Sequence, residues 1–298
     1  MEGQTEAPEE FRGRIAPGKN WTEIVAWVGD LPPLPQVASK AIRLVEDPDT
    51  TAGQLTDLLS TDTALAARVL KIANSAMFSR QREITTLNQA IMVIGFKALK
   101  GIVVAATLRQ LNRKDGEIEK VVWQNSMCTA MAAHLLAQKL RKPYVDECFL
   151  LGLLKNLGKL VLIRQCSDEY GEIYKRVKGG EVTFFQAETD VLGFAHPLIG
   201  ALVAKKWNFS PEICQVILHH HDPIEPGAFA SDMDEKTAVV QIANWVAHNC
   251  PATHIAGYPN NFEDLKPVIN QLGFEDEAFE KLREDVEVTY SEQSSVFG

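Results

Sequence analysis

Hydrophobic positions recur at helical spacing along nearly the whole chain, and strand-like alternation over more than four residues is absent. In the first part of the chain, apolar sets predict helices around Val37–Val45, Leu55–Leu59 and Leu65–Met77, then over 87–94 and 97–111. Pro48 ends the first of these, because the residue before a proline is pushed out of the helical region. Gly95 is expected to separate the last two. These segments predict a compact helical bundle that ends near Arg113.

The polar, turn-rich segment Asn112–Gly116 predicts a junction between this bundle and a second helical body. Further helices are predicted near 117–141, 145–165, 168–178, 182–192, 197–207, 210–221 and 235–250, with two more in the acidic stretch 261–292. The expected fold class is all-α, a two-lobed helical bundle. We expect residues 1–20 to be a flexible tail, 21–113 an N-terminal lobe, 114–255 a second lobe, and 256–298 an acidic C-terminal helical extension.

Composition narrows the class of protein. The 298 residues are 46% hydrophobic and 23% charged, as in ordinary globular chains. Five cysteines without a CxxC pair are typical of a reduced, cytosolic protein. Residues 1–18 lack the apolar core of a secretory signal, and the longest apolar stretch, 84–108, is interrupted by Lys97 and Lys100. We therefore expect a cytoplasmic protein with no membrane span and no further catalytic module.

Charge bears on partners. Residues 1–113 carry a net charge of +1 and the remainder carries -10, which together give the formal -9. Because nucleic-acid binding draws on clustered cations, such a surface predicts no nucleic-acid partner. Residues 84–104 have the outline of a DNA-reading helix-turn-helix, but the second of those helices is apolar almost throughout, which favours a buried packing helix.

One motif concerns chemistry. The run Glu147–Leu160 resembles the core helix of HD-type phosphohydrolases, in which a His-Asp pair holds a catalytic divalent metal. Here that pair is Lys155-Asn156, a cation and a neutral amide. Metal ligands of this kind must donate electron pairs, as a neutral imidazole and an ionised carboxylate do. The resemblance therefore implies a related fold that lacks the related chemistry.

A longer series of motifs resembles the HDOD family, the HD-related output domain of bacterial signalling proteins. The motifs are Leu31–Pro35, Val45–Pro48, Leu58–Asp62, Ala67–Ser75, Ile84–Ile91, Trp123–Ser126, Gly152–Leu154, Gly158–Leu160, His196 with Gly200 and Trp207, His220–Pro223 and Ile242–Asn244, so the resemblance spans 21–249. It implies an N-terminal small bundle followed by a degenerate HD-type phosphohydrolase-like domain. It also implies a non-catalytic output or adaptor module that contacts a signalling protein, often one that handles cyclic di-GMP. A homodimer is a further expected possibility.

Carried over position by position, the resemblance places the first metal-site histidine at Asn125, the His-Asp pair at Lys155-Asn156 and the late aspartate at Asn244. Three histidines remain at matching positions: His196, His220 and His221. We expect these seven residues to line a remnant pocket. With the carboxylates lost, we expect no catalytic residue, no metal and no cofactor.

Three interpretations of the remaining histidines stay open. They are structural residues; or, with Lys155, they form a cationic pocket for a phosphate, carboxylate or nucleotide; or they bind a transition metal. Pro197 predicts that His196 begins a helix, where backbone amides favour an anion. The interpretation as a metal site is less favoured than the anion pocket, because the carboxylates that would bridge metal ions are missing. The alternative function is a residual metal-dependent phosphohydrolase that cleaves cyclic nucleotides or phosphate esters.

Overall fold

The structure is a computed structural model that describes residues 7–297 except 18, 30–33, 76, 79–83, 112–115, 181, 225–226, 228, 256–257 and 260. The regular elements of these residues are fifteen α-helices and one short 3-10 helix. The one β pairing among them is an isolated bridge between Ile15 and Phe194. The predicted all-α fold class is confirmed.

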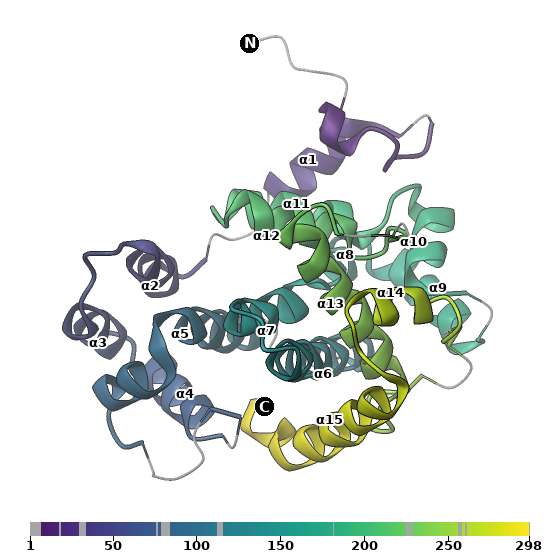
Figure 1. Ribbon diagram of the computed structural model, residues 1–298. Coiled ribbons are helices and arrows are strands. Elements are labelled where there is room, and N and C mark those ends of the chain that lie inside the picture. Colours follow the sequence, from purple (N-terminus) through teal and green to yellow (C-terminus); the bar gives the residue numbers. More distant parts are fainter. Residues whose placement is uncertain are drawn as a thin grey trace.

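The helices of the first part of the chain are α1 (Trp21–Gly29), α2 (Gln36–Glu46), α3 (Ala52–Ser60), α4 (Thr63–Ala73) and α5 (Leu87–Leu111). Thr51 begins α3 with a capping box, and the Asp62 carboxylate accepts from the Leu65 amide to begin α4. Gly95, with φ 77°, interrupts α5 where the sequence predicts a break. Helices α2 to α5 lie together on one side of the molecule, whereas α1 packs on α11 (Figure 1).

Helix α5 bears on the membrane question. Its span Leu87–Arg109 is long and apolar enough to cross a bilayer by length and composition alone. Of its most apolar window, 61% is buried inside the fold, as in the core helices of soluble proteins. Most apolar side chains of α5 therefore serve packing, whereas Met92 and Val93 are exposed.

The second part of the chain contributes α6 (Glu117–Lys139), α7 (Val145–Leu154), α8 (Leu157–Gln165), α9 (Ser167–Lys178), α10 (Phe184–Leu192), α11 (His196–Lys206), α12 (Pro211–His219) and α13 (Asp232–Asn249). Helices α6 and α7 lie at the centre of the molecule (Figure 1). The prediction of one helix over 145–165 is wrong, because Lys155 and Asn156 form a turn between α7 and α8. Asn156 leaves the helical region at φ -93° and ψ 9°, while hydrogen bonds to Asn125 and Ser126 hold its side chain.

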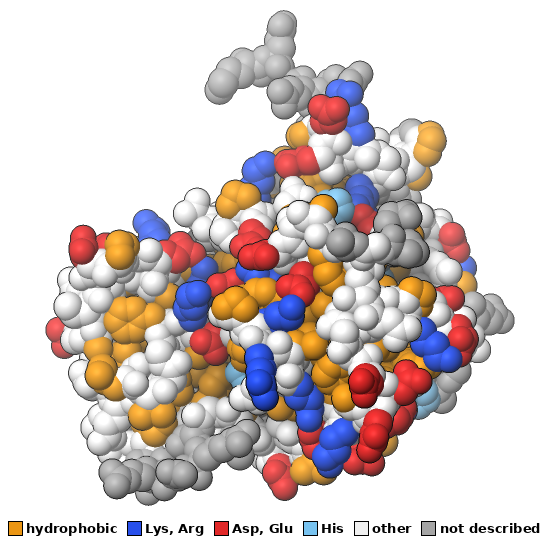
Figure 2. Space-filling view, in the orientation of Figure 1, with side chains coloured by type: hydrophobic (Ala, Val, Ile, Leu, Met, Phe, Trp, Pro, Cys, Tyr) orange, Lys and Arg blue, Asp and Glu red, His pale blue; other side chains and the backbone are white. Residues whose placement is uncertain are grey.

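The C-terminal helices α14 (Lys266–Gln271) and α15 (Asp276–Phe297) cover the second part of the chain and reach the first. Helix α15 was predicted within the acidic stretch, and its apolar side chains Phe279, Leu282 and Val286 are buried. Near its end, α15 packs on α4, where Lys71 Nζ donates to the Ser295 carbonyl over 2.8 Å. Acidic side chains, with basic ones among them, gather over α15 (Figure 2). The C-terminal segment therefore connects the two predicted lobes.

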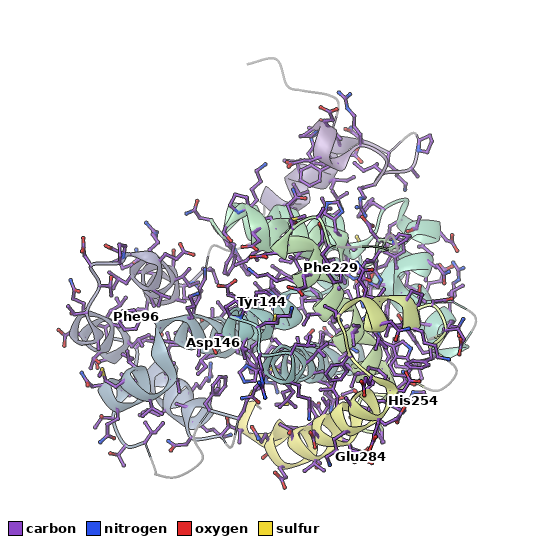
Figure 3. All side chains as sticks on the ribbon, viewed as in Figure 1. Phe96, Tyr144, Asp146, Phe229, His254 and Glu284 are labelled. Atoms are coloured by element: carbon purple, nitrogen blue, oxygen red, sulfur yellow. The ribbon has the colours of Figure 1, made fainter. Side chains whose placement is uncertain are left out.

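One continuous hydrophobic core contains residues from α1 to α15, so the two predicted lobes share it. Tyr144 and Asp146 lie at the start of α7, and Figure 3 labels them between Phe96 of α5 and Phe229. At this place Lys236 Nζ donates to the carboxylates of Glu147 and Glu212, 2.7 Å from each. The predicted junction falls on residues 112–115, outside the described residues, as do residues 31–33 of the proline-rich motif.

Within the segment expected to be a tail, residues 7–17 pack on the second part of the chain. The Ala16 amide donates to the Gly193 carbonyl over 2.7 Å. Arg14 forms hydrogen bonds with Asp222 and with His219, the residues that flank His220 and His221. The N-terminal segment therefore joins the loop before α11 to the loop after α12.

Candidate functional site

Two close helix contacts bring the predicted site residues together. A Cβ atom on Gly152 of α7 would lie 2.8 Å from Ala130 Cα of α6, and one on Gly158 of α8 would lie 2.0 Å from the His196 carbonyl oxygen of α11. Only glycine permits approaches this close. They place the Lys155-Asn156 turn between Asn125 on α6 and His196 at the start of α11.

Lys155, Asn156 and Asn125 form one hydrogen-bonded group. Asn125 Oδ1 accepts from Lys155 Nζ at 2.8 Å and from Asn156 Nδ2 at 2.9 Å. The Lys155 side chain is buried, with 1% of the residue exposed. Burial lowers the pKa of Lys155 well below its usual range, and repulsion from Lys159 lowers it further. This half of the site thus holds an amine and two amides where a metal would need an imidazole and carboxylates.

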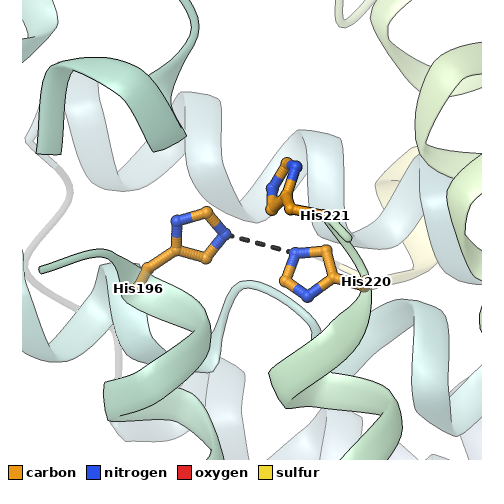
Figure 4. A group of neighbouring side chains, drawn as sticks. All are labelled: His196, His220 and His221. Atoms are coloured by element: carbon orange, nitrogen blue, oxygen red, sulfur yellow. Dashed lines mark hydrogen bonds between the residues drawn. The ribbon is translucent and has the colours of Figure 1, made fainter. Parts of the chain in front are cut away.

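His196, His220 and His221 form a second group, drawn in Figure 4. The Nε2 atoms of His196 and His220 are 3.2 Å apart, and a ring nitrogen of each of the three residues lies within 4.8 Å of the others. His196 is the first residue of α11, as predicted, while His220 and His221 follow α12. Burial lowers the pKa of all three imidazoles well below the usual value. The structure therefore brings together three neutral imidazoles.

Glu188 is a site residue that the sequence analysis missed. It is fully buried on α10, and its Oε2 atom accepts from the His196 backbone amide at 2.7 Å and lies 2.6 Å from His196 Nδ1. Its Oε1 atom accepts from the Tyr170 hydroxyl at 2.6 Å. Burial raises the pKa of Glu188 to about 7, against the attraction of Lys159 and these hydrogen bonds. A signal was present, since Glu188 lies one helical turn from Phe184 and from Leu192 and so on the apolar face of its helix.

Asn244 lies where the site meets a surface cavity of about 490 Å³, which His220, His221 and Gln241 also line. No described group hydrogen-bonds the buried Oδ1 atom of Asn244. All seven predicted site residues therefore lie in two adjoining groups and at the mouth of one cavity. Burial is the main cause of the lowered pKa of the three imidazoles, and positive charge at Lys159 or Lys155 lowers the pKa of each further.

The remaining histidines lie outside this arrangement. His134 faces away from the site and meets the Phe78 ring edge-on at 5.9 Å between centroids. His248 is buried and stacks on the Tyr258 ring, with 4.0 Å between the ring centroids. His254 Nδ1 lies 2.9 Å from the His248 carbonyl, and His219 binds Asp222 and Gln215.

With the fold and the site described, the chain can be compared with known proteins. The HDOD domain matches residues 31–223, well over half of the sequence. The chain belongs to the HDOD domain family. HDOD domains occur in signalling proteins. An uncharacterized protein of Treponema pallidum is 24% identical to this HDOD chain over 196 residues, and the uncharacterized protein YuxH of Bacillus subtilis is 26% identical over 108. These matches cover 65% and 36% of this chain, but only 38% and 26% of those longer relatives.

Solved structures share the fold. An HDOD domain protein of unknown function from Geobacter sulfurreducens superposes with a TM-score of 0.72 at 23% identity, over 92% of this chain and 97% of that one. A protein from Marinobacter aquaeolei, provisionally named a signal transduction protein, gives a TM-score of 0.71 at 20% identity, over 90% of this chain and 60% of that one. At this identity the likeness shows the HDOD architecture and leaves the chemistry to the site itself.

The two groups differ in what they fit. HD-type phosphohydrolases hold divalent metals between imidazoles and carboxylates. The residues Asn125, Lys155 and Asn156 do not fit such an ion, because they offer no carboxylate or imidazole and because Lys155 Nζ fills the space beside Asn125. The three imidazoles offer the donor atoms of a transition-metal site. The site therefore fits at most half of a paired metal centre.

Proposed function

We propose that this HDOD chain is a non-catalytic output or adaptor module of signal transduction, which acts through contact with a protein partner. The observation that carries the proposal is the hydrogen bond from buried Lys155 to Asn125, which fills one half of the site with an amine and an amide. Phosphoester hydrolysis by paired metals needs ions on both sides of the reacting phosphate. A site closed in this way retains the binding surface of the fold without its reaction.

A small anionic ligand in the remnant pocket is part of the proposal. The groups available to it are Lys159, whose Nζ also lies 4.3 Å above the Phe184 ring, and the buried Nδ2 atom of Asn125, which no described group accepts from. The cavity beside His220, His221 and Asn244 gives access from the surface. Asp222 at its wall is already neutralised by Arg14. An anion of phosphate or carboxylate size suits these donors.

The partner is proposed to be another signalling protein, from the class that makes, degrades or binds cyclic di-GMP, and the protein to be cytoplasmic. The acidic second part of the chain makes nucleic acid a poor partner. The five cysteines are free thiols, which suits a reducing compartment. Affinity capture from the native cell should recover such a protein with the chain.

The test of the proposal is an activity assay on chelator-treated protein reloaded with divalent metals. We expect no turnover of cyclic dinucleotides or simple phosphate esters above the rate of a His220→Ala variant. Turnover that disappears in His220→Ala and in Asn156→Ala would favour the alternative, a residual metal-dependent phosphohydrolase that uses His196, His220 and His221. The grouping of these three residues is the one observation on the side of that alternative.

A further inference from the structure

Two imidazole nitrogens of the histidine group face each other through their lone pairs. His220 Nδ1 donates to the Ile217 carbonyl over 2.7 Å, so its Nε2 atom carries no proton in the neutral ring. His196 Nδ1 lies 2.6 Å from the carboxylate of Glu188, and with the proton on that nitrogen its own Nε2 atom is also bare. These two Nε2 atoms are 3.2 Å apart. Lone pairs at this distance repel each other unless a cation lies between them.

The third imidazole decides which cation fits. A shared proton joins two nitrogens, whereas His221 brings a third nitrogen within 4.8 Å of the other two. A tetrahedral ion with metal–nitrogen distances of 2.0–2.1 Å holds neighbouring nitrogens about 3.3 Å apart. The 3.2 Å between His196 and His220 is close to that spacing. The three rings are thus arranged as ligands of one ion.

Groups behind the rings support the same conclusion. Histidines that bind metals donate their other ring nitrogen to a carboxylate or a backbone carbonyl, which fixes the tautomer and the direction of the ring. His196 has Glu188 in this position and His220 has the Ile217 carbonyl. Tyr170 in turn holds the far oxygen of Glu188 at 2.6 Å. A merely structural pair of histidines needs no such orientation of both free nitrogens toward a common point.

We infer that His196, His220 and His221 bind a single transition-metal ion, with Glu188 as a positioning residue. Three imidazoles favour Zn²⁺, Co²⁺, Ni²⁺ or Fe²⁺ over Mg²⁺ or Ca²⁺, which prefer oxygen ligands. A second ion is excluded by the Lys155–Asn125 group. The expectation of no metal rested on the carboxylates lost at Asn156, in the other half of the site, and at Asn244, beside His220 and His221. A single ion needs neither of them where three imidazoles already face it. The inference rests on the proposed function, since the ion adds a further group that binds the small anion proposed for this pocket.

The test uses the full chain, stripped with a chelator and titrated with Co²⁺, whose visible absorption reports tetrahedral nitrogen ligation. We expect about one Co²⁺ per chain, and a change in the spectrum when inorganic phosphate is added. His221→Asn should weaken Co²⁺ binding at least 10-fold, and Glu188→Gln should weaken it about 10- to 100-fold. His219→Gln is the matched control, because His219 is adjacent in sequence but binds Asp222 and Gln215, and it should leave binding unchanged.

Circular dichroism of each variant shows whether it folds. Should Glu188→Gln fail to fold, the half-buried His221 still provides the decisive variant. Co²⁺ binding that is as weak in the natural protein as in His221→Asn overturns the inference, as does a stoichiometry of two. The activity assay separates this result from the proposed function: metal binding without turnover supports both, metal binding with turnover overturns only the function, and neither metal nor turnover overturns only the metal site.

Discussion

Lys155 Nζ donates a hydrogen bond to Asn125 Oδ1 over 2.8 Å, at the point where α6 meets the turn between α7 and α8. The two residues stand where the family resemblance places two metal-site histidines. The two replacements therefore depend on each other, because the side chain at one former ligand position hydrogen-bonds to the side chain at the other. Asn156 completes the group through the same oxygen atom.

Replacing Lys155 by methionine should stabilise the protein. Burial disfavours the charged form of Lys155 and depresses its pKa, so folding with this side chain inside the protein costs free energy. Methionine has a similar length without the charge, and Asn125 Oδ1 keeps Asn156 as a donor. We expect Lys155→Met to raise the free energy of unfolding at pH 7 by about 1–3 kcal/mol in urea titrations.

The pH dependence of this gain identifies its cause. The unfolded chain binds one more proton than the native chain between the depressed pKa of Lys155 and the ordinary lysine pKa of about 10.4, so the stability of the natural protein rises with pH over that window. The advantage of Lys155→Met should therefore shrink as the pH approaches 10. A variant that is less stable at pH 7, or an advantage independent of pH, would contradict this account.

Gly158→Ala should destabilise the fold and displace His196. The added Cβ would lie 2.0 Å from the His196 carbonyl oxygen and 2.7 Å from the Gly200 amide nitrogen, so α8 and α11 must separate. Overpacking of this kind costs about 1–3 kcal/mol or more. Gly171→Ala is the control, since nothing lies within 4 Å of its added Cβ within helix α9, and it should stabilise by up to about 1 kcal/mol. Equal effects of the two substitutions in thermal unfolding would refute this prediction.

Much of this architecture could be predicted from the sequence, because periodicity reports which face of a helix is buried. The break at Gly95 and the buried face of α15 at Phe279 followed from it. The turn at Asn156 did not, because what interrupts the apolar run is a side-chain hydrogen bond to α6, a contact between distant parts of the chain. Glu188 escaped for a similar reason: its partners Tyr170 and His196 come from other elements, and spacing does not show such contacts.

His134 should make stability depend on pH in mildly acidic solution. Burial lowers its pKa from 6.5 to about 4, so the native state binds its proton only well below the pH at which the unfolded chain does. Its contribution is complete above pH 6.5 and is lost as the pH falls from 6.5 to about 4, by roughly 3 kcal/mol at 1.36 kcal/mol per pKa unit. In His134→Leu this loss should be absent.

Urea titrations of the natural protein and of His134→Leu at several pH values measure the difference directly. The comparison cancels the carboxylates that titrate in both proteins. Parallel stability curves for His134→Leu and the natural protein between pH 4 and 6.5 would show that His134 is protonated in the native state.

Restoring the lost ligands should convert a single ion site into a paired one. The variant Asn125→His, Lys155→His, Asn156→Asp, Asn244→Asp removes the buried amine and supplies imidazoles and carboxylates opposite His196, His220 and His221. Metal analysis after Mn²⁺ or Fe²⁺ loading should then give about two ions per chain, against one for the natural protein. Carboxylates that bridge the ions offset the repulsion between them, which the natural amides cannot do.

A partial restoration serves as the control for this variant. Asn125→His with Asn244→Asp leaves Lys155 in place, and its Nζ atom would then compete with any second ion for the space beside residue 125. We expect this double variant to bind one ion, because the buried amine and not the number of ligands limits occupancy. If the double variant binds two ions as readily as the fourfold variant, Lys155 does not block the second position. The loss of the carboxylates alone would then explain why the natural protein lacks a second ion.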